Sequence, residues 1–225
     1  MEEAILRLKL ENGSPDTLCF WRGRNCVVIG YNPARDHVDV GLCKALGIPI
    51  CRRYSGGGAI YQDNGNLNYS LIAAQGGSGL PRDVQRARRI IDSAVAGAMA
   101  GLGLQAQTMS GGGVSVGGRK VSGSAQFVLW GGLLHHGVIA VSTNLGVMYR
   151  LLPSNKIEVT TLERELGRKI NMKKLATAIA SKFADVFGAQ LCIGKPTEAE
   201  MSMAQKLLDE KYLSKEWVNS GVLDA

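Results

Sequence analysis

The sequence of 225 residues predicts an α+β fold, in which a mixed, largely antiparallel sheet is flanked by helices. Short strand-like runs cluster in the early and middle parts of the chain, and stretches with helical spacing lie between and after them. Strands that do not alternate strictly with helices favour such a sheet over a purely parallel one. The sequence contains neither internal repeats nor a low-complexity linker, which indicates a single domain over residues 1–225.

The first part of the chain predicts two helices and four strands. Gly47 and Pro49 are stop signals that end the second helix. Asp63, Asn64, Gly65 and Asn66 have the chemistry of a hairpin turn between the last two strands. The helices are predicted at residues 2–10 and 36–46, and the strands at residues 17–21 and 26–31, around a turn at Gly23, and at 59–62 and 67–73, while residues 49–53 lead into a glycine turn at 55–58.

The second part predicts a long helix, a glycine-rich piece, three strands and three helices. The long helix covers residues 83–102, where Val84, Ile91, Val95 and Ala98 fall on one helical face. The glycine-rich piece covers 110–118, the strands 119–122, 125–130 and 134–142, and the later helices 146–152, 172–187 and 197–208.

The charge balance points away from nucleic acid. The net charge is +7 and the pI is about 9.3, but lysines and arginines are spread along the chain. Nucleic-acid-binding proteins usually cluster their basic residues and place aromatic residues among them. The balance therefore indicates a solvated surface with a bias toward acidic partners.

The cysteines and the apolar runs indicate a cytoplasmic protein. The five cysteines form no C-x-x-C pair, which predicts buried, reduced thiols and no zinc site. The N-terminus lacks a cationic stretch followed by an apolar run, so no signal peptide is predicted. No apolar run approaches the roughly 18–20 residues that a membrane span needs.

The first candidate site segment runs from Arg52 to Tyr61, where two arginines lead into three glycines and an apolar strand. Glycines let backbone N–H groups approach a ligand closely, and an adjacent arginine can pair with a carboxylate or phosphate. The spacing matches neither G-x-G-x-x-G nor G-x-x-x-x-G-K-[ST]. On these residues alone, an ordinary hairpin turn with solvated arginines remains an alternative.

Two further candidate segments lie on predicted strands. Lys120 alternates with apolar residues and precedes small ones, so its ammonium could lie over a cleft and stabilise negative charge on a carbonyl or phosphoryl oxygen. His135 and His136 are neighbours on a strand and point to opposite faces, which makes a shared metal improbable. Taken singly, a surface lysine and two structural histidines remain alternatives.

Together the three segments resemble the lipoate–protein ligase A family, within the biotin and lipoate ligase superfamily. The matching pieces are RRYSGGGAIYQDNGNLNYSLI (52–72), GRKVSGSAQ (118–126) and LLHHGVIAVSTNL (133–145), and CVVIGYN (26–32) and KYLSKEW (211–217) are similar too. The resemblance implies a fold related to class II tRNA synthetases. It also implies that lipoate attacks the α-phosphate of ATP, which Mg²⁺ accompanies, and that a carrier lysine then takes the lipoyl group from lipoyl-AMP.

The resemblance also implies roles for individual residues. Lys120 would be catalytic, with its charge between the lipoyl carbonyl oxygen and the AMP phosphate. No residue is implied as a metal ligand. The residues that would bind the phosphate and acyl end are Arg53, Ser55, Gly56, Gly57, Gly58, Ala59 and Asn66, and Ala125 and His136 would line the lipoyl pocket.

The sequence departs from the family pattern in four places. Gln62 stands where a histidine is usual, and Gly112-Gly113 stands where many members have an Asn-Asp pair thought to help with the nucleotide or metal. Ser142 and Asn144 replace acidic residues. The chain begins at what looks like the family's first helix, so the preceding strand is expected to be missing.

Four rival functions remain open. Octanoyl or lipoyl transferases of the superfamily pass the acyl group through a cysteine thioester without ATP. No cysteine occurs between Ser93 and Leu191, where those relatives place it, and Cys51 is the one candidate. A transferase that needs no cysteine, a biotin–protein ligase, and an impaired binding protein for lipoyl domains are further alternatives.

The implied partners are lipoyl domains of 2-oxoacid dehydrogenase acyltransferase subunits and the glycine-cleavage carrier protein. The chain ends near the expected end of a catalytic domain, so no accessory C-terminal domain is expected within it. Some ligases receive that domain as a separate small protein. The chain alone is therefore expected to adenylate lipoate poorly.

Overall fold

The larger of two sheets is antiparallel throughout. The computed structural model describes residues 1–32, 37–77 and 79–221. The six strands lie in the order β1-β5-β9-β8-β7-β6, and each neighbouring pair is antiparallel. They are β1 (Thr17–Trp21), β5 (Asn66–Ala74), β9 (Gly132–Ala140), β8 (Arg119–Leu129), β7 (Val114–Val116) and β6 (Ala106–Thr108).

The smaller sheet is mixed and has the order β3-β2-β4. Its strands are β2 (Cys26–Ile29), β3 (Ile50–Arg52) and β4 (Ile60–Gln62). Strand β2 runs parallel to β3 and antiparallel to β4. The predicted α+β fold with a mixed, largely antiparallel arrangement is therefore confirmed.

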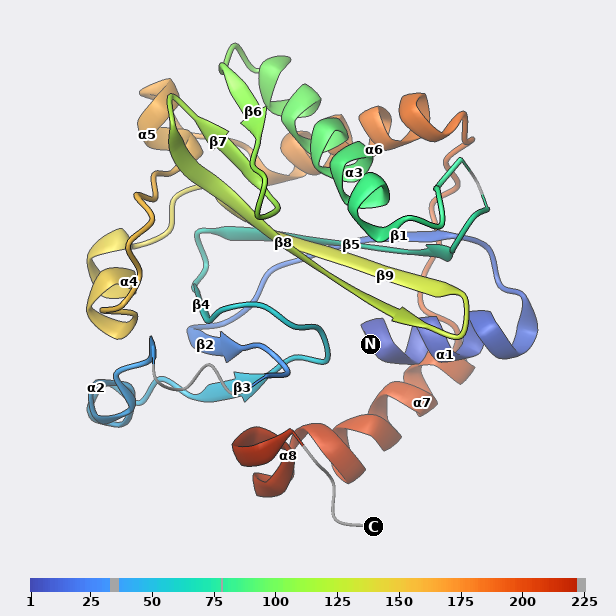
Figure 1. The fold of residues 1–225 in the computed structure, drawn as a ribbon, viewed down its shortest axis with the longest axis horizontal. Coiled ribbons are helices and arrows are strands. Elements are labelled where there is room, and N and C mark those ends of the chain that lie inside the picture. Colours follow the sequence, from blue (N-terminus) through green and yellow to red (C-terminus); the bar gives the residue numbers. More distant parts are fainter. Residues whose placement is uncertain (33–36, 78, 222–225) are drawn as a thin grey trace.

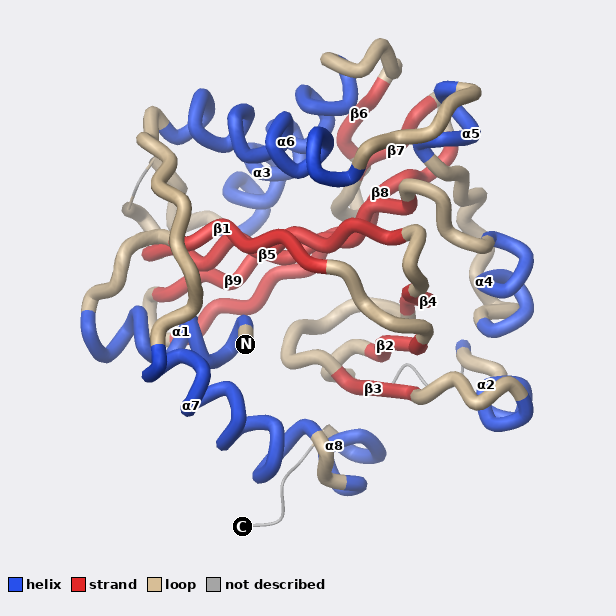
Figure 2. Tube along the Cα trace, turned by 180° about the vertical axis from the view of Figure 1, so that it is seen from behind, coloured by secondary structure: helices blue, strands red, loops and turns tan. Residues whose placement is uncertain are grey.

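Helices cover both faces of the large sheet. Helices α3 and α6 lie on one face, and α1 and α7 lie on the other, together with the small sheet (Figure 1). The view from behind shows the same layers, with α2 and α4 beside the small sheet (Figure 2). The helices are α1 (Glu2–Asn12), α2 (Val40–Ala45), α3 (Val84–Ala100), α4 (Leu145–Leu151), α5 (Leu162–Leu166), α6 (Met172–Phe187), α7 (Glu198–Leu207), the π-helical turn η2 (Leu208–Tyr212) and α8 (Lys215–Ser220).

Three hydrophobic clusters follow these layers. The largest lies between the sheet and α3 and α6, where Ile91, Val95 and Ile179 are buried as the helical spacing predicts. A second joins the small sheet to α2 and α4, and a third lies under α1, where Ile5 and Leu6 pack on Ile72 and Leu134. The two faces of the large sheet thus have separate cores.

The hairpin predicted at residues 63–66 is wrong, and both this turn and the predicted turn at Gly23 pass from one sheet to the other. Strand β1 pairs with β5, whereas β2 pairs with β3 and β4. Strands β4 and β5 also belong to different sheets. Asp63 explains the second crossing, since its carboxylate accepts the N–H groups of Gly65 and Asn144 and so ties the turn to the segment after β9.

Other differences concern the shortest elements. The strands predicted at 119–122 and 125–130 form the single strand β8, while β3, β6, β7, α5 and α8 were not predicted. Strand β7 lies inside the glycine-rich piece 110–118, for which no strand was predicted. The predicted helix 36–46 begins at a residue outside the described part of the chain, and its described portion is Val40–Ala45, capped by Asp39.

Helices in the described part of the chain are too short or too polar to span a bilayer. The prediction of buried cysteines is correct for Cys43 but wrong for Cys51 and Cys192, which are exposed. Cys19 and Cys26 are partly buried.

Candidate active site

Arg53 shapes the glycine turn. Its Nη2 donates to the carbonyls of Gly56 and Gly58, at 2.6 and 2.9 Å. Its Nε donates to Ser55 Oγ at 3.1 Å, and its Nη1 donates to the Val28 carbonyl at 3.3 Å. Most of its donors are therefore used inside the protein. Burial lowers the pKa of the Arg53 guanidinium to about 10, against the opposing charge of Glu2, so Arg53 still brings a positive charge to the turn.

Backbone contact fixes the same turn against β2. Gly57 has a φ of +95°, which favours glycine. A Cβ at Gly30 would lie 2.0 Å from the Gly57 carbonyl oxygen, so position 30 has no room for a side chain. Tyr31 N–H also donates to the Ser55 carbonyl at 2.8 Å. The residues after β2 and the glycine turn therefore form one rigid unit.

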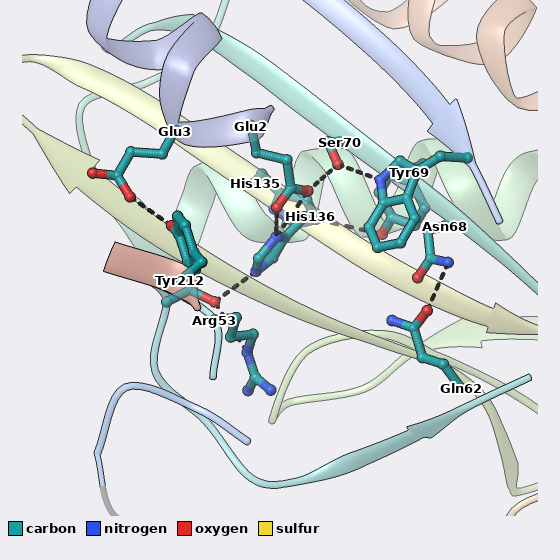
Figure 3. A network of polar contacts seen from close by, with 12 residues as sticks. Glu2, Glu3, Arg53, Gln62, Asn68, Tyr69, Ser70, His135, His136 and Tyr212 are labelled. Carbon is teal, nitrogen blue, oxygen red and sulfur yellow. Dashed lines mark hydrogen bonds and ion pairs between the residues drawn. The ribbon is translucent and has the colours of Figure 1, made fainter. Parts of the chain in front are cut away.

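His136 joins the turn to the large sheet and to α1. Its Nε2 lies 2.6 Å from Ser55 Oγ, and its Nδ1 lies 3.1 Å from both carboxylate oxygens of Glu2. Ser70 donates to the same carboxylate and accepts from Trp21 Nε1 at 3.3 Å. Figure 3 shows Glu2 and His136 pointing toward each other.

Glu2 is ionised in this network. Burial raises the pKa of its carboxyl, but the His136 ring and the Ser70 hydroxyl together outweigh that effect, so the pKa lies below its ordinary value. Glu2 gave no signal in the sequence, because a glutamate in the first turn of a helix is common there for helix-dipole reasons alone.

Lys120 lies on β8, on the same face as His136. A Cβ at Gly123 would lie 3.5 Å from Lys120 Nζ, so the ammonium lies over Gly123. Gly123 and Ala125 are two residues apart and share a face, and Ala125 pairs with His136 across β8 and β9. Within the described residues, Nζ has no hydrogen-bond or ion-pair partner. An ammonium held in this way is available to a ligand.

The region around Ala125 is apolar. Phe127, two residues along the same face, packs on the Tyr54 ring with centroids 4.1 Å apart. Phe127 also borders the cluster under α1. Small and apolar side chains therefore lie beside Lys120 and His136, as a substrate with an apolar chain requires.

Asn66 and Ala59, both predicted as binding residues, are used inside the fold. Asn66 Oδ1 accepts the Asp63 N–H at 2.7 Å within the turn before β5, and Ala59 packs against the small-sheet core. Gln62, which stands at the usual histidine position, accepts from Asn68 Nδ2 at 3.1 Å. Asn144, at an expected acidic position, caps α4.

His135 faces the other core. It is buried, with Nε2 3.6 Å from Asp92 Oδ1 and 3.4 Å from the Tyr69 hydroxyl. Burial, with help from the charges of His136 and Arg88, lowers the pKa of His135 to about 3. His135 is therefore neutral, and the prediction that the two histidines point to opposite faces is confirmed.

The C-terminal helices clamp the start of α1 and the end of β3. Lys211 and Tyr212 bind the Glu3 carboxylate at 2.8 and 2.5 Å. Arg52 donates to the carbonyls of Val218 and Asn219, and Trp217 Nε1 donates to the Arg52 carbonyl at 3.1 Å. Arg52, the first of the two arginines that lead into the glycine turn, is thus buried in this clamp. The alternative of solvated arginines is wrong for Arg52.

The larger of two described hollows, of about 440 Å³, lies at this clamp and not at Lys120. Tyr31, Tyr54 and Trp217 line it around Lys211. Lys120 remains the better candidate for binding an anionic ligand, because the Lys211 ammonium is already paired with Glu3 and lies 4.1 Å from the Trp217 ring.

Cys51 is exposed, and its free thiol is hydrogen-bonded to the free thiol of Cys26 on the neighbouring strand. This hydrogen bond lowers the pKa of the Cys51 thiol to about 7 and raises the pKa of Cys26. A cysteine that carries an acyl group needs an activating base. His136 is occupied by Ser55 and Glu2, and His135 is buried on the other face of the sheet. Neither histidine is placed to serve Cys51.

The fold and this site define an enzyme of the class that attaches or transfers lipoyl and octanoyl groups. The family described as lipoyl protein ligase A/B catalytic domain matches residues 1–184. The chain belongs to this family.

Relatives of both enzyme types are similar to the chain. It is 30% identical to lipoate-protein ligase A subunit 1 of Thermoplasma acidophilum, over 99% of this chain and 90% of the relative. It is 31% identical to octanoyltransferase LipM of Symbiobacterium thermophilum, over 96% and 91%. A crystal structure of a lipoate-protein ligase A bound with ATP has a TM-score of 0.87 at 27% identity, covering 98% of this chain and 92% of that one.

A further solved structure is described as a bipartite lipoate protein ligase and its E2 lipoyl domain from Thermoplasma acidophilum. Its TM-score is 0.88 at 28% identity, covering all of this chain and 91% of that one.

Proposed function

We propose that the chain is an ATP-dependent lipoate–protein ligase, which forms lipoyl-AMP and transfers the lipoyl group to a lysine of a lipoyl domain. The observation that carries the proposal is the Lys120 ammonium, held over Gly123 on the sheet face that also bears the His136–Ser55 contact. The ATP-bound and bipartite relatives described above support the same reading.

In the first step, a carboxylate oxygen of lipoate attacks the α-phosphate of ATP, and pyrophosphate leaves. Lys120 would stabilise negative charge on both the carboxyl and the phosphate oxygens. Backbone N–H groups of the turn 56–58 and the charge of Arg53 would hold the same anionic end. Mg²⁺ bound with ATP would shield the phosphate charges, and no residue of this chain is assigned to it.

In the second step, the ε-amine of a carrier lysine attacks the lipoyl carbonyl, and AMP leaves. Lys120 would again face the oxygen that gains charge. Ala125, with Phe127 and Tyr54 beside it, would accommodate the apolar chain of the substrate. His136 would keep the Ser55 hydroxyl at the edge of this region.

Pyrophosphate exchange tests the proposal. The chain should exchange labelled pyrophosphate into ATP only when lipoate is present. A second, separate subunit, as in the bipartite relative, should strengthen the reaction. Absence of exchange both with and without such a protein contradicts the ligase proposal.

The LipM relatives favour one second candidate, an octanoyltransferase that works through Cys51 without ATP. Incubation with an octanoylated carrier protein should then give a thioester on Cys51 that Cys51→Ser abolishes. We expect no such adduct, since neither His135 nor His136 is placed to activate Cys51. Exchange that persists in Cys51→Ser would support the ligase.

A further inference from the structure

Asp92 occupies an unusual position for a carboxylate. It lies on the face of α3 that packs into the large core, beside Ile91, Ala94 and Val95, and its residue is 1% exposed. Burying a carboxylate is costly unless charges and hydrogen bonds compensate for it. The contacts of Asp92 therefore indicate what it is for.

One oxygen of Asp92 holds two backbone segments together. Asp92 Oδ2 accepts the Gly113 N–H at 2.9 Å and the Ser124 hydroxyl at 3.2 Å. Gly113 comes just before β7, and Ser124 lies on β8, the strand of Lys120. Asp92 thus fixes the turn that leads into the strand beside Lys120.

Gly113 cannot itself carry a side chain. Its φ is +94°, and a Cβ there would lie 2.1 Å from the Ser122 carbonyl oxygen. The position that resembles the acidic member of an Asn-Asp pair is therefore closed to any carboxylate. The nearest carboxylate to its backbone comes from α3.

The other carboxylate oxygen of Asp92 accepts no hydrogen bond from the described residues, so its charge is compensated only by nearby positive groups. Oδ1 is buried and has no hydrogen-bond donor among the described residues, with His135 Nε2 3.6 Å away. Because His135 is neutral, it does not compensate the charge. Lys120 and Arg88 supply the positive charges that act on Asp92, while Tyr69 faces it from β5.

We infer that Asp92 is a positioning residue for Lys120: it anchors the turn before β7 and β8, and its charge keeps the Lys120 ammonium protonated and in place. This inference rests on the proposed catalytic role of Lys120. Two electrostatic effects agree with it. Burial lowers the pKa of Lys120, and the charge of Asp92 opposes that shift. Burial raises the pKa of Asp92, and the hydrogen bonds from Gly113 and Ser124 and the charges of Arg88 and Lys120 offset this only in part.

Titration of Lys120 by NMR tests the inference without relying on activity. With ¹³C-labelled lysine, the Lys120 side chain should titrate at lower pH in Asp92→Asn than in the wild type. Ser124→Ala removes a contact of Asp92 but no charge, and it should leave this titration unchanged. Asp185→Asn is the matched control for a lost surface carboxylate. An unchanged Lys120 titration in Asp92→Asn overturns the inference.

A reciprocal measurement serves if Asp92→Asn does not fold. In Lys120→Met, the Asp92 carboxyl should titrate at higher pH than in the wild type. Identical Asp92 titrations in both proteins overturn the inference.

Kinetics then connect the pair to catalysis. In Asp92→Asn, kcat for lipoyl-AMP formation should fall by about 10–100-fold, as expected when a catalytic group is misplaced. The alkaline limb of its pH profile should also move to lower pH, which a purely structural defect would not cause. An inactive wild type with coupled NMR titrations would refute the proposed function but not the pairing; normal kinetics in Asp92→Asn would refute the positioning role.

Discussion

His135 and His136 are neighbours on β9, yet their side chains lie in different environments on opposite faces of the sheet. His136 is bonded through both ring nitrogens, to Ser55 and to Glu2, at a partly exposed face. His135 is buried, and its Nδ1 has no hydrogen-bond partner among the described residues, like Asp92 Oδ1 and Ser122 Oγ near it. One face of the sheet thus has hydrogen-bonded polar groups near solvent, and the other has buried polar atoms that lack a hydrogen-bond partner among the described residues.

Because both faces of the sheet carry polar side chains, polarity alone does not locate a binding surface. The face of His136 carries Lys120, Ala125 and the glycine turn, which are the groups proposed to meet the substrate. The face of His135 carries Asp92, which we infer to act through Lys120. Substitutions on the first face should change catalysis, and those on the second should change stability first.

The largest effect is expected on the His136 face. Lys120→Met should lower lipoate-dependent pyrophosphate exchange by roughly 10²–10³-fold, because one preorganised charge is lost. Its unfolding free energy should also fall, because the buried Asp92 carboxylate loses one of the positive charges that compensate it. Lys169→Met, which removes an exposed lysine, is the control. A Lys120→Met enzyme with wild-type exchange would remove the basis of the proposed mechanism.

On the other face, His135→Ala should cost roughly 2–4 kcal/mol of stability, since it leaves a cavity and removes a neighbour of the buried Asp92 carboxylate. Urea unfolding should show a lower midpoint at an unchanged slope. His37→Ala, at an exposed position, should show no shift. A stable His135→Ala protein would mean that the two faces do not differ as described.

The pH dependence of stability should also distinguish the face of His135 from the face of His136. The pKa of His135 is about 3 in the folded protein and about 6.5 when unfolded, so the unfolded chain binds the extra proton first. The contribution of neutral His135 to the free energy of unfolding should therefore be fully present above pH 6.5. It should fall by about 1.4 kcal/mol per pH unit below that pH. Glu2 and Glu3, whose pKa values are lowered, should add to the loss only below about 4.5.

Measuring unfolding free energy across this range in the wild type and in His135→Ala isolates the histidine. The variant should be flat between 6.5 and 4.5, apart from the other titrating groups that both proteins share. Equal slopes would contradict the assignment of a neutral, buried His135.

The smallest effect is expected from the hydrogen bonds of His136. Truncating a contact of this kind costs about 1 kcal/mol, so His136→Ala should raise the KM for lipoate about fivefold. Ser55→Ala should have a similar effect, and the double variant should be no worse than either one, because both remove the same contact. Additive effects would show that His136 and Ser55 act separately.

The long elements could be predicted from the sequence, and the pairing of strands could not. The spacing of Ile91, Val95 and Ala98 determines the buried face of α3, and α6 was predicted with its observed bounds. The turn at Asp63–Asn66 has hairpin residues, but the bonds from Gly65 and Asn144 to Asp63 send the chain into another sheet. A partner 81 residues away is invisible to local turn chemistry.

The structure brings together candidate site residues where a sequence motif carried them. Lys120, Ser55 and His136 were named from the sequence, and the structure brings Ser55 and His136 within 2.6 Å. Glu2 and Asp92 were missed, because a first-turn glutamate and a lone aspartate in a helix have ordinary structural explanations. Arg53 and Asn66 show the reverse case, since their donors and acceptors are largely used by the protein itself.

Arg52 makes the glycine turn depend on residues synthesised much later. Its guanidinium binds the Val218 carbonyl, 166 positions further along the chain, and the turn begins just after it. Chains leave the ribosome from the N-terminus at about 5–20 residues per second, so this turn emerges many seconds before its support. A nascent chain therefore cannot hold the glycine turn in its final geometry until the residues around Val218 have been made.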